Sequence, residues 1–333
     1  ELPNAPNLGA DLVIGQFDLF SKTVNGADEE RRTMAGPRGI AVDQVGPSHR
    51  LFVADTEARR ILLWLSPPGS DGQAADKVIR NVEAVSIAIR PEPAPNSHLR
   101  MLAAAEANNG TVLLWRNLDP NTINNDVRPD PTVTLSANLE VPRAVWFDTD
   151  GRLFVSDASK HPIWKDDATV HNRVLVWEVP PTTGDQPPTT VALERPGLAV
   201  GAPSAEFLAG YAAGGAAISH ADDGTATSTG TVYVTDPFAH RVVWFTAVPA
   251  PSGGKITEAQ GLFGQPRFVT AETNADGVSA RSLFLMNEAY EFSAASTHNP
   301  EPGLAITRNP STQKDYLWIA DTYNNRVLRV PLP

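Results

Sequence analysis

The sequence predicts an all-β fold, a single five-bladed β-propeller of four-stranded antiparallel blades. Three observations predict it. A cassette of two short apolar strands, the first ending in Asp and the second opening with Arg, recurs along the chain. Each copy except the last lies within a set of four short strands separated by turns rich in Pro and Gly, which is the content of one meander blade. The first three copies are also evenly spaced, as repeated structural units require.

The cassette is clearest in RLFVADTEARRILLW at residues 50–64. Strong copies follow as RLFVSD with HNRVLVW (152–157 and 171–177), TVYVTDPFAHRVVWF (231–245) and DYLWIADTYNNRVLRV (315–330). A weaker copy, HLRMLAAAEANNGTVLLW (98–115), keeps both apolar strands but lacks the Asp and the Arg. Asp55, Glu106 and Asp157 end equivalent strands at equal intervals.

In chain order, residues 1–10 are rich in Pro and Asn and predict no regular structure. Residues 11–17, DLVIGQF, predict a strand without a partner nearby in the sequence. Residues 18–36 are polar, and one short helix is expected within them. The blades then occupy, in order, about residues 37–80, 85–137, 143–194, 216–265 and 302–330.

The last predicted blade stops after its third strand, and residues 11–17 are expected to supply the fourth. Their sequence resembles GLFGQ at residues 261–265, the outer strand of the fourth blade. An N-terminal strand that joins the C-terminal blade closes the ring and removes exposed sheet edges. A six-bladed alternative would place a degenerate blade within residues 266–301.

Three inserts, at residues 18–36, 195–215 and 266–301, link consecutive blades. In a four-stranded meander, such links share one face with the loops that join the second strand to the third. The longest of those loops is 158–172. We therefore expect all four segments on one face of a single propeller domain, where loops on a rigid scaffold would form the binding surface.

The repeated Asp–Arg pairs are predicted to be structural. An active site needs asymmetry, whereas this pair occurs four times, so each carboxylate is expected to accept loop N–H groups and the Arg guanidinium. The pairs are Asp55–Arg60, Asp157–Arg173, Asp236–Arg241 and Asp321–Arg326. Aromatic residues close the third strands and are expected to pack between blades, with a row of ligand-stacking rings as the alternative. They are Trp64, Trp115, Trp177 and Phe245.

The loop 158–172 carries the richest local set of chemical groups. Carboxylates and imidazoles together could hold a divalent metal or contact a ligand, and a plain solvated loop is the alternative. The candidates are His161, Trp164, Asp166, Asp167 and His171.

Four further candidates lie on or beside the inserts. Tyr211 belongs to an apolar segment that could cap the channel, and His220 ends an inner strand, where side chains reach the channel. Glu288 and Tyr290 could point into the same cleft. A structural role in a cap or a core is the alternative for these residues.

The runs P-x-G-I-A-V-D…L-F-V-A-D-T…R-R-I-L and L-W-I-A-D-T-Y-N-N-R-V-L resemble the NHL repeat of β-propellers, in its long-repeat bacterial form. The resemblance covers most of the chain and departs from the pattern in the second blade and the inserts. It implies the fold but no single activity, because propellers host unrelated functions. Similar propellers include streptogramin lyases and peptide-amidating lyases, which place a metal and a His or Tyr base at the channel mouth.

The composition excludes several kinds of partner and site. The 38 acidic and 27 basic residues give a net charge of −11, and an acidic surface repels phosphate backbones, so no nucleic-acid partner is expected. The absence of Cys excludes disulfides and thiolate sites, and no apolar run approaches the ~18 residues of a membrane span. A start at Glu1 favours a processed, exported bacterial protein, extracellular or periplasmic. We expect a monomer.

Together these patterns favour an exported binding module that presents its loop-insert face to a protein, peptide or glycan. They commit to no cofactor. The alternative is a metal-assisted lyase or hydrolase at the channel mouth, which would need His161, His171, His220 and His298 to converge.

Overall fold

The computed structural model describes residues 10–20, 31–45, 48–93, 95–125, 128–137, 139–148, 150–158, 173–192, 216–219, 231–236, 240–246, 254–256, 258–267, 277, 279, 281–283, 303–308, 311–312 and 314–332. The chain divides into two compact units. One comprises Glu1–Glu106 with Val112–Thr134, and the other comprises Ala107–Thr111 with Leu135–Pro333.

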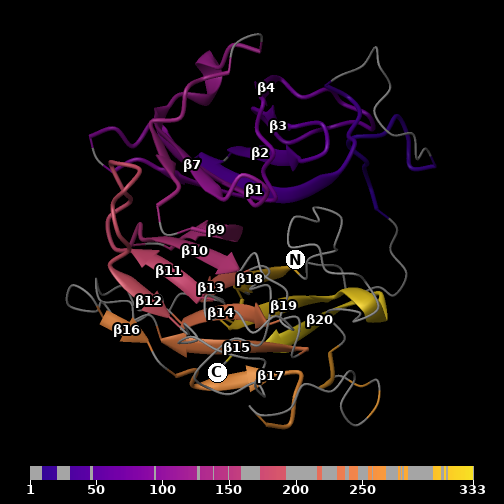
Figure 1. Cartoon of the computed structure of the whole chain (residues 1–333). Coiled ribbons are helices and arrows are strands. Elements are labelled where there is room, and N and C mark those ends of the chain that lie inside the picture. Colours follow the sequence, from indigo (N-terminus) through magenta and orange to yellow (C-terminus); the bar gives the residue numbers. More distant parts are fainter. Residues whose placement is uncertain are drawn as a thin grey trace. The chain divides into compact units, whose positions relative to one another are not determined.

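The first unit contains two four-stranded sheets in which strands that follow one another in sequence lie side by side (Figure 1). The first sheet consists of β1 (Pro37–Val45), β2 (Ser48–Asp55), β3 (Arg60–Trp64) and β4 (Lys77–Arg80). The second consists of β5 (Ser86–Pro91), β6 (Arg100–Glu106), β7 (Thr111–Leu118) and β8 (Val133–Leu135), with a short 3₁₀ helix, η1 (Pro120–Thr122), after β7.

The second unit contains three sheets. The third blade consists of β9 (Val141–Phe147), β10 (Leu153–Ala158), β11 (Arg173–Trp177) and β12 (Thr190–Ala192). The fourth consists of β13 (Ala216–Ser219), β14 (Thr231–Asp236), β15 (Arg241–Thr246) and β17 (Gly261–Phe263). The fifth consists of β18 (Leu304–Arg308), β19 (Asp315–Asp321) and β20 (Arg326–Pro331), with η3 (Thr322–Asn324) between the last two. The five predicted blades are therefore confirmed, and the fold is a five-bladed β-propeller.

One strand was not predicted. Residues Gly254–Ile256 form β16, which pairs parallel to β12 and extends the third blade to five strands. The sequence there is part of a turn-rich link, with Gly253 and Gly254 side by side, and a strand this short leaves no alternating pattern to detect.

The turn between second and third strands has a repeated backbone geometry. The residue just before the Arg takes a positive φ in three blades, with 52° at Arg59, 49° at His240 and 52° at Asn325. In these three blades the tight reversal is followed by an antiparallel register in which the Asp stands opposite the Arg, and the third blade has the same register across its longer loop. The register pairs are Asp55–Arg60, Asp157–Arg173, Asp236–Arg241 and Asp321–Arg326.

The apolar faces of neighbouring blades pack together within the first unit. One buried cluster joins Phe52 and Leu63 of the first blade to Leu102 and Trp115 of the second. The aromatic residues predicted to pack are all buried, with exposed fractions of 2% or less at Trp64, Trp115, Trp177 and Phe245. Their burial agrees with the packing interpretation and leaves no exposed row of rings for stacking.

Residues 11–17 and the last blade belong to different units, so their predicted pairing stays a prediction. Of these residues, only Gly15 forms a β-bridge, to Thr33, and the last sheet contains β18, β19 and β20 among the described residues. The backbone of Val13 is engaged within the first unit: its N–H donates to Asp71 Oδ1 (2.8 Å), and its carbonyl accepts from the N–H of Gly72 (3.0 Å). An apolar run is stabilised by any buried contact. The sequence pattern alone does not choose between two apolar surfaces.

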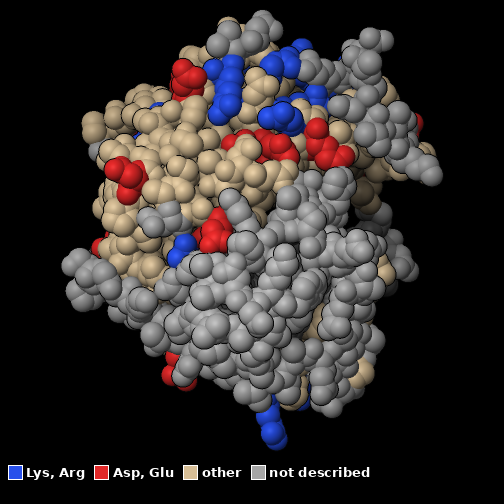
Figure 2. All heavy atoms as spheres, viewed as in Figure 1, with Lys and Arg blue, Asp and Glu red and all other residues tan. Residues whose placement is uncertain are grey.

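No helix among the described residues is long and apolar enough to cross a membrane. On the face of the molecule in Figure 2, the described acidic and basic side chains lie beside one another rather than in a field of one sign.

Candidate functional site

The Asp–Arg pair of the first blade fastens the segment that enters the blade. Arg60 Nε donates to Asp55 Oδ2 at 2.9 Å, and both side chains are buried. The other carboxylate oxygen accepts the backbone N–H groups of Ala35 and Gly36, each at 2.9 Å. Arg60 Nη2 also donates to the carbonyl oxygen of Thr33 at 2.7 Å. The prediction that these N–H groups come from the loop between the second and third strands is wrong for this blade, because they come from the link that enters it.

The third blade repeats this arrangement. Asp157 Oδ1 accepts the N–H groups of Glu140 (2.9 Å) and Val141 (3.0 Å), while Arg173 donates to Oδ2 at 3.2 Å. Burial raises the pKa of Asp157 to about 6, against the opposing effects of the Glu140 N–H group and the Arg173 charge. The carboxylate is therefore held by structural contacts and is not presented to solvent.

The two remaining pairs lie in the second unit. Arg241 Nε donates to Asp236 Oδ2 at 2.9 Å, and the Arg241 side chain is fully buried. Arg326 Nε donates to Asp321 Oδ2 at 2.6 Å. Its Nη2 donates to the carbonyl oxygens of Ser279 and Ser282, both at 2.8 Å. All four pairs thus carry the contacts expected of structural elements.

The ligand-binding candidates from the sequence lie outside the described residues. They are His161, Trp164, Asp166, Asp167, His171, Tyr211, His220, Glu288 and Tyr290, and His298 lies outside as well. Their convergence stays a prediction. Among the residues that the structure describes, no group of three or more His, Asp or Glu side chains is placed to hold a metal ion.

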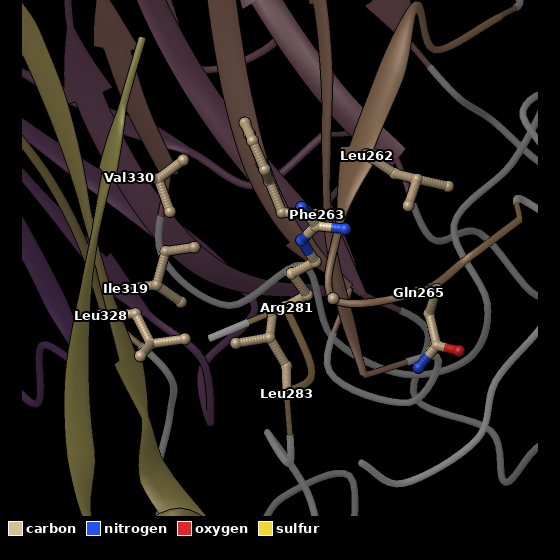
Figure 3. Close-up of a pocket in the computed structure, with 9 residues that line it drawn as sticks. Leu262, Phe263, Gln265, Arg281, Leu283, Ile319, Leu328 and Val330 are labelled. Atoms are coloured by element: carbon tan, nitrogen blue, oxygen red, sulfur yellow. The ribbon is translucent and has the colours of Figure 1, made fainter. Parts of the chain in front are cut away.

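A pocket of about 320 Å³ lies between the outer strand of the fourth blade and the last blade (Figure 3). Leu262 and Phe263 form one side, on β17, and the β19–β20 hairpin forms the other. Arg281 and Leu283, from the predicted insert 266–301, also line it, together with Gly264 and Gln265 just after β17. The hairpin residues are Ile319, Leu328 and Val330.

Two close contacts hold the wall of this pocket in place. Gly264, at φ 95°, forms a parallel β-bridge with Ser282, and a Cβ atom there would stand 2.5 Å from Leu283 Cδ1. Gln265 Nε2 donates to the carbonyl oxygen of His240 at 3.3 Å. The chain can therefore pass this close to the insert only with a glycine at residue 264.

His240 is a buried titratable group beside this wall. Burial lowers its pKa to about 4, although the charge of Asp321 acts in the opposite direction. The imidazole is therefore neutral at pH 7. His240 was not among the predicted site residues, because in the repeated sequence it is simply the turn residue before Arg241.

Sequence reasoning also missed the pocket. Most of the residues that line it are ordinary apolar residues, which do not mark a binding site in a sequence. One signal was available in the sequence: the last blade has Val330 where the other four end the third strand with Trp or Phe.

The fold defines the class of this chain, a five-bladed β-propeller with an apolar pocket beside its last blade. No protein-family model matches the sequence, and no curated protein matches it. Among solved structures, the hydrazine synthase of Kuenenia stuttgartiensis is similar at 12% identity over 90% of this chain and 85% of that chain, with a TM-score of 0.46. A gluconolactonase from Xanthomonas campestris is similar at 14% identity over 90% and 77%, with a TM-score of 0.42. At these values neither structure carries an argument about function.

Proposed function

We propose that this chain is a binding module, a β-propeller of the NHL-repeat type that holds a protein, peptide or glycan ligand at the links between its blades. The observation that carries the proposal is the pocket beside the last blade, which Arg281 and Leu283 of the insert 266–301 help to line. Mostly apolar pockets with a few placed polar groups are the usual form of ligand sites.

Contacts within each unit support the idea that links and turns share a face. In the first blade, the N–H of Thr56 donates to the carbonyl of Gly36, and the N–H of Val82 donates to the carbonyl of Arg59, both at 3.0 Å. In the last blade, Arg326 binds the carbonyl oxygen of Ser282. The link that enters each of these two blades therefore lies beside the turn between its second and third strands.

The size of the pocket limits what enters it. Its volume of about 320 Å³ lies at the lower end of the range for ligand sites, ~300–1,000 Å³. A site of this size takes one side chain or one ring of a larger ligand. The rest of a peptide or glycan would then lie across the surrounding links.

A ligand panel with a blocked variant tests the proposal. Val330→Trp places a large ring in the pocket, and Val327→Trp puts the same ring on the exposed face of β20 as a matched control. Short peptides, glycans and small organic acids are screened by the shift they cause in melting temperature, and hits are confirmed by calorimetry. We expect at least one ligand that wild type and Val327→Trp bind and Val330→Trp does not. A panel whose every hit binds Val330→Trp as well as wild type contradicts the proposal.

The enzyme alternative is separated from the binding module by metal content. Elemental analysis of the purified protein, with and without chelator treatment, measures whether one metal ion is held per chain. A stoichiometric metal would favour the lyase or hydrolase. The extracellular or periplasmic location stays a prediction, which fractionation of cells that produce the protein would test.

A further inference from the structure

The last blade lacks the aromatic ring that the other blades bury. Four blades have a described register between their second and third strands. In each of them, the residue that closes the third strand pairs with the residue four positions before the repeated Asp. These pairs are Leu51–Trp64, Leu153–Trp177, Val232–Phe245 and, in the last blade, Leu317–Val330. Val330 therefore occupies the position of a buried Trp or Phe.

The first blade shows what this place looks like when it is filled. Gly15 bridges Thr33 there, just as Gly264 bridges Ser282 beside the last blade. The next residues, Met34 and Leu283, take equivalent places. The filled cluster contains Ile14, Met34, Val53, Leu62 and Trp64, and the matching residues around the pocket are Phe263, Leu283, Ile319, Leu328 and Val330.

The comparison identifies the pocket as the space of a missing ring. In the first blade, Trp64 is fully buried and its indole Nε1 donates to the carbonyl oxygen of Gln73 at 3.1 Å. In the last blade, the same position leaves a pocket of about 320 Å³. Phe263 on its wall stacks on Tyr233 with ring centroids 6.3 Å apart, so an aromatic surface already faces the space. A planar ring fits such a wall and gains from offset or edge contacts with it.

Arg281 adds a positive charge at this space. Its side chain is exposed, and its guanidinium forms no ion pair or hydrogen bond with any residue in the described part of the chain. In Figure 3 the side chain rises between Leu283 and Phe263. The adjacent Ser282 is anchored through its carbonyl oxygen by Arg326 at 2.8 Å, so the backbone beneath Arg281 is held. A guanidinium in this setting suits a carboxylate, which it can bind through two N–H groups.

We propose that this pocket binds a ligand that combines one aromatic ring with a carboxylate. The ring takes the place of the indole that the other blades supply, and the carboxylate pairs with Arg281. This inference rests on the proposed binding function and names the ligand chemistry of the same site. Both the C-terminal aromatic residue of a peptide and a free aromatic acid have that chemistry.

Matched probes test the two halves of the proposal by calorimetry. N-acetyl-L-tryptophan supplies ring and carboxylate, N-acetyl-L-tryptophanamide supplies the ring alone, and acetate supplies the charge alone. Wild type should bind the acid about tenfold more tightly than the amide, the size of effect expected of a charge-assisted contact, and acetate should not bind. The peptide Gly-Gly-Trp represents a C-terminal aromatic residue, and indole-3-propionate represents a free aromatic acid. Their affinities show which of these two ligand types binds more tightly.

Variants assign the effects to residues. Arg281→Ala should remove the preference for acid over amide, while Arg267→Ala, an exposed position on the same link, should keep it. Val330→Trp, with Val330→Phe as a second filling variant, should abolish binding of both probes, and Val327→Trp should not. Circular dichroism and melting curves verify that each variant folds.

Two results would overturn the inference. Equal affinity for the acid and the amide in wild type rules out the role of Arg281. Binding that survives in both filled variants rules out the pocket. If wild type ignores these probes but other panel members bind in a way that Val330→Trp blocks, the aromatic carboxylate is rejected and the binding module stands.

Discussion

Arg326 Nη2 donates to the carbonyl oxygen of Ser282 at 2.8 Å, while Nε of the same side chain donates to the carboxylate of Asp321 at 2.6 Å. One guanidinium thereby ties the third strand of the last blade both to its second strand and to the link that enters the blade. Arg60 makes the equivalent bond to the carbonyl oxygen of Thr33. The repeated pair thus bonds a hairpin to the preceding link, and in the last blade it holds the link residues that line the pocket.

Removing one buried Arg should be strongly destabilising. Arg241 is fully buried, so Arg241→Ala leaves the buried carboxylate of Asp236 without its cation. We expect the free energy of unfolding to fall by about 3–5 kcal/mol, as for other broken buried pairs. Urea denaturation measures it. Arg326→Ala is the comparison, because its side chain is 25% exposed and water can replace part of the contact, so its loss should be smaller. Equal losses in the two variants would argue against burial as the cause.

His240 should make stability depend on pH. Its pKa is about 4 in the folded state and about 6.5 in the unfolded state, so the unfolded state binds the extra proton between those values. Its contribution to stability is complete above about pH 6.5 and is lost as pH falls towards 4, with a limiting slope of about 1.4 kcal/mol per pH unit. His240→Asn keeps a residue that tolerates the positive φ and removes the titration. Unfolding midpoints of the variant should vary less between pH 6.5 and 4 than those of wild type.

Asp157 should act with the opposite sign. Burial raises its pKa to about 6, above the value of about 3.9 for an unfolded chain, so the folded state binds the extra proton between these values. Its contribution to stability is present below about pH 4 and declines as pH rises through 6. Because the His240 titration overlaps this window, carboxyl ¹³C chemical shifts give the cleaner measurement. A midpoint for Asp157 near pH 4 would contradict the effect of burial.

Gly264 should tolerate no side chain. In Gly264→Ala, the added Cβ atom would lie 2.6 Å from the carbonyl oxygen of His240, and the alanine would have to adopt a φ of 95°. Strain and overpacking each cost about 1–3 kcal/mol, so the free energy of unfolding should fall by at least about 2 kcal/mol. Gly69→Ala is the control, since no atom lies within 4 Å of the added carbon. Chemical denaturation of the two variants should separate them clearly; similar midpoints would mean that the link is free to move away.

Much of the fold was predictable because its determinants are local and repeated. Short apolar runs bounded by turn residues mark each strand, the turn before the repeated Arg sets the register, and the Asp–Arg pair joins residues as close as Asp55 and Arg60. The five blades and the burial of Trp64 and its counterparts follow from these patterns. The length of the last blade was also evident, since the repeat ends with its third strand.

The tertiary structure decided which distant surfaces meet. It shows the carboxylate of Asp55 bound to the entering link at Ala35, and the backbone of Val13 bonded to Asp71 and Gly72. It also shows that Val330 borders a pocket, which the sequence records only as one smaller residue in a repeated position. The physical reason is that empty space and long-range contacts are properties of all the neighbours together. A periodic pattern determines which residues point inward, and only packing determines what they meet there.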